Sequence, residues 1–397
     1  MNFNKTISII KNYPPIFWLL IGGAFLNQAG NMAFVFLVPY LTLHMGFSIA
    51  QAAIAFATFG FSTLISGIIG GSLVDRLGPV RIMVSALFLT GATLLFFPWV
   101  KQYHSILFMC MLWGMGFGLF RPSVKTFVSF LTPVEFHRIS FSIYRWALNL
   151  GMSIGPAVAG FIAMHSFPSI FVINALANIV TGIVFLIGFF PTPWFTYRPS
   201  TASTFEFSLK WLWQDARLRT VLMGLVLIEI VFVQHQSLLS LFLTEHLGFS
   251  LSFYGLLFTL NTVIIVFCEL PLNVLTFHWT PRINLMLGSL LIAIGFTGLA
   301  FATVKWQVLL LAVFWTFGEM IMFPTATAYV SEISPEKNRG SYMSLLDATD
   351  HLGLCLGPWI GALIVGHFAM NSLWIACGLF GLTSILFFNL VIQKSPR

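Results

Sequence analysis

Acidic side chains inside apolar stretches are the residues of this sequence best suited to chemistry. All of them fall in its second half: Glu229, Glu269, Glu319, Asp347 and Asp350. Removal from water disfavours the charged form of a carboxyl group, so such a group can exchange protons near neutral pH. Glu319 lies closest to the middle of its stretch, which makes it the first candidate for a proton carrier, and Glu229 comes next. Glu269 lies about one turn from the end of its stretch and is expected to serve loop electrostatics.

Polar residues at matching positions of the two halves form a second group. Arg145 and Asn149 are four residues apart and share one helix face. At the equivalent points 202 residues later lie Asp347 and His351. A charge this deep in an apolar stretch should face the protein interior or a cavity. Two interpretations stay open: an Arg145–Asp347 ion pair that ties the halves together, or a role for these groups in substrate or proton binding.

Arg121 also lies inside an apolar stretch, where it could bind a substrate anion, and it is expected to approach Glu319. Lys125, one turn on, is expected to extend toward the membrane interface. We assign proton coupling to Glu319, Glu229, Asp347, Asp350 and His351. We assign a substrate cavity to Arg121, Arg145, Asn149, Asn27, Gln234 and Gln236.

The composition requires that these residues be positioned by membrane helices. The chain has 397 residues, of which 58% are hydrophobic and 8% charged, with a mean hydropathy of +0.92. Lipid offers no partner for backbone amides, so apolar stretches that cross a bilayer must be helical. Twelve such stretches are predicted, at roughly 16–43, 50–72, 82–100, 104–130, 139–165, 167–190, 219–244, 251–274, 283–302, 306–330, 341–367 and 371–393.

The distribution of Lys and Arg predicts the orientation. If the stretches alternate in direction, most of the 19 basic residues fall on one side, and Lys101 and Lys305 fall on the other. Positively charged loops favour the cytoplasm, so both termini are expected there. The same loops account for the formal charge of +7, and no nucleic acid partner is needed.

The turn between the second and third stretches carries a recognisable motif, Gly71-Ser-Leu-Val-Asp75-Arg76-Leu-Gly78-Pro-Val-Arg81. It resembles the signature loop of the major facilitator superfamily of transporters, G-x-L-x-D-R-x-G-x-x-R. The resemblance implies twelve helices in two six-helix bundles. It also implies that Asp75 docks at the cytoplasmic start of the eleventh stretch (341–367), near Gly340, and latches the outward-facing state.

A second motif, Gly151-x-x-x-Gly155-Pro156 in the fifth stretch (139–165), resembles an element common in exporters of that family, including the drug:proton antiporters. Its glycines permit close helix packing. The second half carries Gly353-x-x-x-Gly357-Pro358, so packing alone also accounts for the pattern. The sequence departs from the family's motif in the fourth stretch, because Cys110 occupies the position of its arginine. The resemblance implies a part in proton exchange for that arginine, and Arg121 could replace it.

Repeated residues 202 positions apart indicate an internal duplication. Gly46-Phe47-Ser48 recurs as Gly248-Phe249-Ser250. We predict bundles at 1–190 and 217–397 with a cytoplasmic linker at 191–216. The second half lacks the signature loop, since Asn273 and Phe277 stand where Gly71 and Asp75 are expected.

The sequence therefore favours a secondary transporter of the major facilitator type, with proton-coupled export of a small organic solute as the expected activity. A proton-coupled importer of an anionic metabolite is the first alternative, and a non-transporting receptor with the same fold is the second. No phosphate-binding loop, zinc-ligand cluster or nucleophile triad is apparent, so neither an ATP-driven pump nor an enzyme is expected. We expect a monomer in the bacterial inner membrane, in contact with lipid, protons and its substrate, without a cofactor and driven by the proton gradient.

Overall fold

Helices form the whole framework of the described chain. The computed structural model describes residues 13–133, 136–195, 213–276, 278–335 and 339–391, and within these ranges it contains helices and turns but no strand. Eleven helical segments of the described residues are long and apolar enough to cross a membrane. The predicted all-α membrane fold is therefore confirmed.

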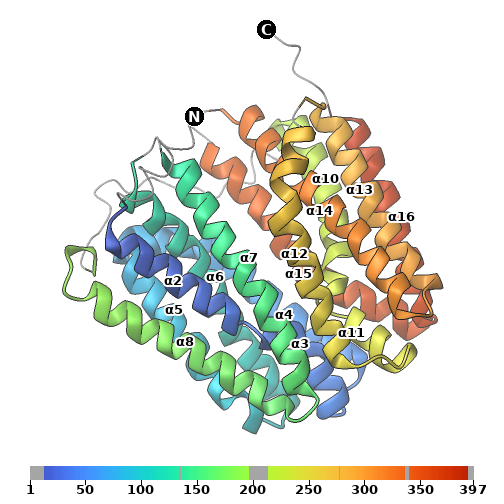
Figure 1. Cartoon of the computed structure of the whole chain (residues 1–397), viewed down its shortest axis with the longest axis horizontal. Coiled ribbons are helices and arrows are strands. Elements are labelled where there is room, and N and C mark those ends of the chain that lie inside the picture. Colours follow the sequence, from blue (N-terminus) through green and yellow to red (C-terminus); the bar gives the residue numbers. More distant parts are fainter. Residues whose placement is uncertain (1–12, 134–135, 196–212, 277, 336–338, 392–397) are drawn as a thin grey trace.

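Two sets of helices lie side by side, the first coloured blue to green and the second yellow to red (Figure 1). The first set is α2 (Pro15–Gly30), α3 (Ala33–Pro39), α4 (Ile49–Leu77), α5 (Pro79–Phe96), α6 (Tyr103–Leu131), α7 (His137–Ala163) and α8 (Phe167–Phe189). The second is α10 (Ala216–Phe232), α11 (Leu239–Leu241), α12 (Leu251–Leu275), α13 (Pro281–Gly298), α14 (Lys305–Ile333), α15 (Arg339–His367) and α16 (Met370–Asn389).

The helix boundaries follow the sequence repeat. Helices α13 and α14 begin and end 202 residues after α5 and α6. The tight turns before α4 and α12 are also equivalent, because Gly46 and Gly248 have φ angles of 76° and 69°, a left-handed conformation that glycine adopts without strain. We call the membrane face at these two turns the loop face. The opposite face, where α2 begins and α16 ends, is the terminal face.

The first membrane crossing of each half is broken at the same point. Helix α2 ends at Gly30 and α10 ends at Phe232, 202 residues later, and wide π turns follow at Tyr40–His44 and Phe242–His246. The predicted crossing at 16–43 is therefore present as a broken helix, as is the one predicted at 219–244. Its longest helix, α10, has 17 residues, and a 3-10 turn, α11 and the π turn complete the crossing.

Side-chain amides form hydrogen bonds to the backbone at these breaks. In the first half, Asn174 of α8 accepts a hydrogen bond from the amide of Ala33 (3.2 Å). In the second half, the Gln234 amide donates to the carbonyl oxygens of Ile230 (3.0 Å) and Gly357 (2.8 Å). Lipid cannot replace such partners, so these amides are structural requirements of the broken helices.

The two halves meet along two helix pairs, α4 with α15 and α7 with α12. A Cβ atom built on Gly60 of α4 would lie 2.7 Å from the backbone of Leu354 in α15. One built on Gly255 of α12 would lie 2.3 Å from the carbonyl oxygen of Pro156 in α7. Glycine therefore allows direct backbone contact across the interface.

A buried tyrosine joins the halves near the loop face. The Tyr254 hydroxyl of α12 lies 3.0 Å from the carbonyl oxygen of His235 and 3.3 Å from that of Val35, and its side chain is fully buried. These carbonyls belong to the broken segments of opposite halves. Helices α3 and α11, which belong to the same segments, are in contact near the bottom of Figure 1.

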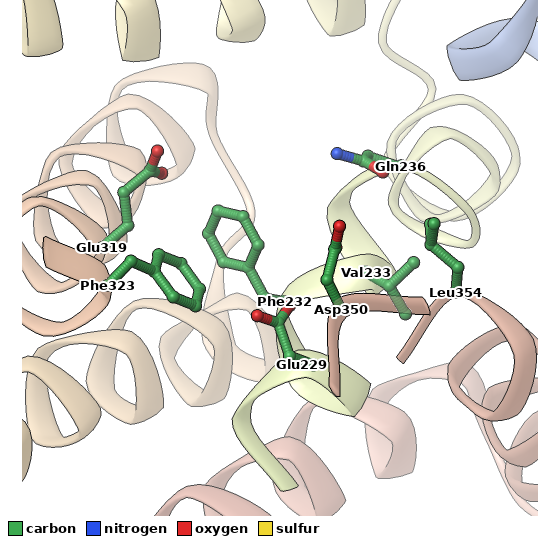
Figure 2. A pocket seen from close by; sticks show the side chains of 8 residues that line it. All are labelled: Glu229, Phe232, Val233, Gln236, Glu319, Phe323, Asp350 and Leu354. Carbon is green, nitrogen blue, oxygen red and sulfur yellow. The ribbon is translucent and has the colours of Figure 1, made fainter. Parts of the chain in front are cut away.

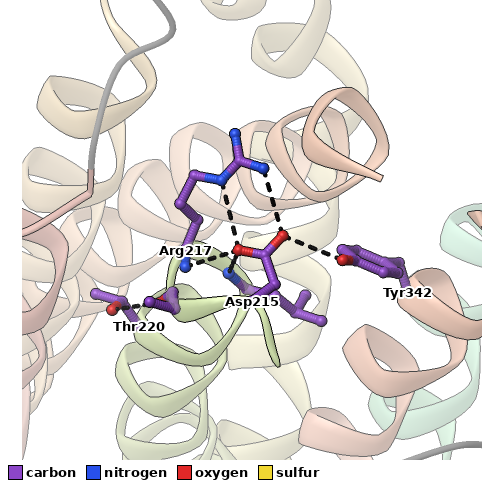
Figure 3. A network of polar contacts seen from close by, with 6 residues as sticks. Asp215, Arg217, Thr220 and Tyr342 are labelled. Carbon is purple, nitrogen blue, oxygen red and sulfur yellow. Dashed lines mark hydrogen bonds and ion pairs between the residues drawn. The ribbon is translucent and has the colours of Figure 1, made fainter. Parts of the chain in front are cut away.

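A second tie joins the first and fifth helices of each half at the terminal face. In the first half the hydroxyls of Tyr13 and Ser140 lie 2.9 Å apart. At the equivalent positions Tyr342 donates to the Asp215 carboxylate (3.1 Å), which also caps α10 and pairs with Arg217 (Figure 3). Burial raises the pKa of Asp215, but the hydrogen bonds from Arg217 and Tyr342 outweigh it and hold the pKa below its ordinary value.

We predict that Tyr254→Phe opens the loop face. The change removes the single proton that the hydroxyl shares between two buried carbonyl groups, a loss of about 1–3 kcal/mol. The distance between spin labels at Leu43 and Glu245, measured by pulsed electron resonance, should lengthen or broaden.

Tyr103→Phe is the matched control, because the Tyr103 hydroxyl donates to the carbonyl oxygen of Gln51 within one half (3.1 Å). This variant should lower stability and leave the label distance unchanged. Identical distances in Tyr254→Phe and the wild type would contradict the proposed tie.

Candidate functional site

An acidic cavity lies inside the second half, between α10, α14 and α15 (Figure 2). Its volume is about 280 Å³. The residues that line it are Glu229, Phe232, Val233, Gln236, Glu319, Phe323, Asp350 and Leu354. The structure thus brings together three of the five residues assigned to proton coupling, and the described lining contains no basic side chain.

Each helix contributes its residues to the cavity at helical spacing. On α10 and the turn after it, Glu229, Phe232 and Gln236 follow the i, i+3, i+7 pattern of one helix face. Glu319 and Phe323 are one turn apart on α14, as are Asp350 and Leu354 on α15. The sequence interpretation missed the two phenylalanines, although their spacing from the carboxylates could have identified them.

The apolar wall of the cavity lies between the acidic groups. The rings of Phe232 and Phe323 meet edge to face with centroids 5.4 Å apart, and in Figure 2 they lie between Glu229 and Glu319. The negative faces of aromatic rings attract cations. Carboxylates around an aromatic wall form a site suited to a positively charged group with an apolar body.

Close packing of α15 on α10 brings two of the acids into one cavity. A Cβ atom on Gly353 would lie 2.5 Å from the Cβ of Glu229, and one on Gly357 would lie 2.1 Å from a Val233 methyl group. In the first half, a Cβ atom on Gly151 or Gly155 would lie within 2.8 Å of the Ala29 backbone. The Gly151–Pro156 motif thus allows α7 to pack closely on α2, and its copy in the second half allows α15 to pack closely on α10. Pro156 and Pro358 lie inside α7 and α15.

Basic residues of α6 reach across to α15 on the terminal-face side of the cavity. Arg121 lies 4.0 Å from Asp350 and stacks on the ring of Phe117 at 4.8 Å. Lys125 lies 3.5 Å from Asp347, so the expectation that it extends to the interface is wrong. These four charged side chains are 40–61% exposed within membrane spans, which indicates a polar opening between the halves at this end.

The Arg145–Asp347 ion pair, one of the two interpretations left open by the sequence, is not formed. Arg145 of α7 pairs with Glu269 of α12, and Asp347 pairs with Lys125. The reason is the arrangement of the halves, since α7 packs on α12 whereas α15 packs on α4. Glu269 accordingly lies at the interface between the two halves, and the expectation that it serves loop electrostatics is wrong.

The remaining polar candidates have separate surroundings. Asn27 donates to Asn178 (2.9 Å) beside a small pocket of the first half, away from the acidic cavity. Gln234 is committed to backbone carbonyls, whereas Gln236 lines the cavity. Asn149 is half-buried on α7. The buried Nδ1 atom of His351 has no hydrogen-bond partner in the described structure, and its ring faces Gly67 of α4.

The signature loop forms a tight turn with a contact that was not predicted. Gly78 has a φ angle of 90° and joins α4, which contains Gly71, to α5. Arg81 donates to the carbonyl oxygen of Phe195 (3.1 Å), and its guanidinium lies 5.5 Å from that residue's ring. Arg76 is exposed. The side chain of Asp75 lies outside the described part of the structure, so the latch remains a prediction.

Comparison with known proteins establishes the family. The family model of the Major Facilitator Superfamily matches residues 20–250 and 235–397. The chain belongs to this superfamily. It is 24% identical over 380 residues to the MFS-type transporter YqjV of Bacillus subtilis, covering 94% of this chain and 92% of that protein. It is 23% identical over 348 residues to the multidrug resistance protein MdtH of Aeromonas hydrophila, covering 83% of each.

Solved structures support the same fold. A mutant of the nucleoside transporter NupG superposes with a TM-score of 0.81 at 12% identity, covering 95% of this chain and 100% of that one. A POT family transporter superposes with a TM-score of 0.78 at 15% identity, covering 95% of each. The chain is therefore an integral membrane protein with the major facilitator fold, and its function is that of a secondary transporter.

We predict that Arg145 and Glu269 are energetically coupled. Each single reversal, Arg145→Glu or Glu269→Arg, places like charges together at the interface, whereas the double reversal restores an opposite-charge pair. Transport and thermal stability should recover in the double variant, with a coupling energy of about 0.5–3 kcal/mol.

The matched control is the double reversal Arg145→Asp with Asp347→Arg, which should give no recovery. Recovery in this control, or its absence in the Arg145–Glu269 pair, would contradict the assignment.

Proposed function

We propose that this transporter exports a small organic solute with a positive charge in exchange for protons. The observation that carries the proposal is the acidic cavity, in which Glu229, Glu319 and Asp350 surround an aromatic wall. A cation and a proton compete for the same carboxylates. That competition is the physical basis of antiport, because binding of one releases the other.

Glu319 is the proposed carrier. It lies at the middle of the 29-residue helix α14, at the wall of the cavity and within hydrogen-bond distance of Asn261. Glu229 is almost fully buried in the same cavity, on the other side of the Phe232 and Phe323 rings, and Asp350 lies close to Arg121. The proposed proton path runs from Asp350 through Glu229 to Glu319, the order in which they lie in Figure 2.

An importer of an anionic metabolite is less well supported. It needs a basic group free to bind the anion, whereas Arg121 and Arg145 lie beside Asp350 and Glu269. The names of two relatives agree with export or antiport: the multidrug resistance protein MdtH, and the Na⁺, Li⁺, K⁺/H⁺ antiporter of Planococcus maritimus, which is 21% identical over 404 residues. We keep the receptor alternative as an outcome of the test.

We further propose that the terminal face is cytoplasmic and that the membrane is the bacterial inner membrane. The basic residues of the turns on that face support this orientation. In this orientation the structure is closed toward the outside by Tyr254 and open toward the cytoplasm beside Arg121 and Lys125. The energy source is the proton gradient, and the transporting unit is a monomer of two halves, 1–190 and 217–397.

We predict that Glu319→Gln abolishes proton-driven transport, because the amide mimics the protonated carboxyl and cannot release a proton. Efflux of a fluorescent organic cation from proteoliposomes with an imposed pH gradient measures the loss. Exchange of labelled for unlabelled solute, which needs no proton, should continue.

Glu332→Gln is the matched control, since Glu332 is exposed near the end of the same helix, and it should behave as the wild type. Wild-type, pH-dependent efflux in Glu319→Gln would exclude this carrier. Absence of any solute movement by the wild type would favour the receptor.

A further inference from the structure

Asn261 of α12 connects the proposed carrier to a buried hydroxyl. Its Nδ2 atom lies 2.9 Å from Oε2 of Glu319 and 2.9 Å from Oγ1 of Thr316, both on α14. Thr316 is fully buried, and Asn261 is partly buried. The Asn261 side chain of α12 thus forms hydrogen bonds to two side chains of the neighbouring helix α14.

The hydrogen bonds fix which end of the amide faces the carboxylate. The Thr316 hydroxyl donates its only proton to the carbonyl oxygen of Ala312 (2.7 Å), so its oxygen accepts from Asn261. Only the NH₂ end of the amide can supply that proton, and its other N–H points to Glu319. Asn261 is therefore oriented as a donor to the carboxylate by a series of hydrogen bonds that runs through Thr316 to the backbone carbonyl of Ala312.

This arrangement is absent from the matching positions of the first half. The residues 202 positions earlier are Phe59, Gly114 and Phe117, and the two phenylalanine rings pack with centroids 5.4 Å apart. Where one half packs hydrocarbon, the other has an amide, a hydroxyl and a carboxyl in contact. The three polar residues form one unit that the duplication did not supply.

We propose that Asn261 is a positioning residue that sets how strongly Glu319 holds its proton during exchange. The inference rests on the proposed function, in which Glu319 is the carrier. A donor to a carboxylate stabilises the charged form. Without it, protonated Glu319 would hold its proton to a higher pH and release it less readily to the incoming cation.

Other charges around Glu319 act in addition to this donor. Glu229 of α10 and Asp350 of α15 share its cavity and repel a further negative charge. Arg121 of α6 and Arg145 of α7 approach from the other half, beside Asp350 and Glu269. The basic groups change their distance when the halves rock, whereas Asn261 belongs to the same half as Glu319. Its contribution therefore stays constant through the cycle.

The test compares Asn261→Leu, of similar size and without a donor, with Asn261→Asp, of the same shape with an acceptor in place of the donor. Both should move the pH of half-maximal proton-driven efflux upward by about one unit or more, a tenfold or greater change in proton affinity. A carboxyl stretching band in the infrared spectrum of the purified protein, assigned by its loss in Glu319→Gln, should persist to correspondingly higher pH.

Thr259→Val is the matched control on the same helix, because the Thr259 hydroxyl donates to the carbonyl oxygen of Ser153 in the other half (2.8 Å) and not to Glu319. It should leave both the midpoint and the band unchanged. If Glu319→Gln abolishes the pH dependence while both Asn261 variants keep the wild-type midpoint and band, the role of Asn261 is wrong and the proposed carrier stands. If Glu319→Gln leaves the pH dependence intact, the proposed function itself fails.

Discussion

Backbone groups that a broken helix exposes inside a membrane must find partners within the protein, and much of this structure meets that requirement. The first crossing of each half is interrupted, after Gly30 and after Phe232. Asn174 and Gln234 supply bonds to the interrupted backbone, and Tyr254 joins both broken segments at once. Because lipid offers no hydrogen bonds, these side chains keep the loop-face contact between the halves in register.

The same break helps to shape the acidic cavity. Glu229 lies on the last turn of α10 and Gln236 lies beyond its end, yet both line one cavity. Gly353 lets α15 approach closely enough for Asp350 to join them. The duplication therefore provides two equivalent sets of helices, and the acids are found at positions of the second set where the first set has other residues. In the first half the corresponding region contains amide side chains, such as Asn27 and Asn178, which form a hydrogen bond with each other.

The sequence was sufficient to predict the fold and to single out three acids that line one cavity, because apolar length, a repeat at constant separation and charges in apolar stretches can all be found in one chain. It was not sufficient for the ion pairs. Whether Arg145 meets Asp347 or Glu269 depends on which helices are neighbours across the two halves, and the repeat does not encode that contact. Asn261 escaped notice because an uncharged amide in a span gives a weak signal, although its counterpart Phe59 could have marked the change.

Competition between a cation and a proton for one set of carboxylates is most directly tested by proton release on binding. Purified protein in weakly buffered detergent solution, with a pH-sensitive dye, is mixed near neutral pH with an organic cation that it transports. We expect protons to be released as the cation binds, with a smaller yield at alkaline pH and none in Glu319→Gln. Binding of the cation without proton release, or release that persists undiminished in Glu319→Gln, would contradict exchange at this cavity.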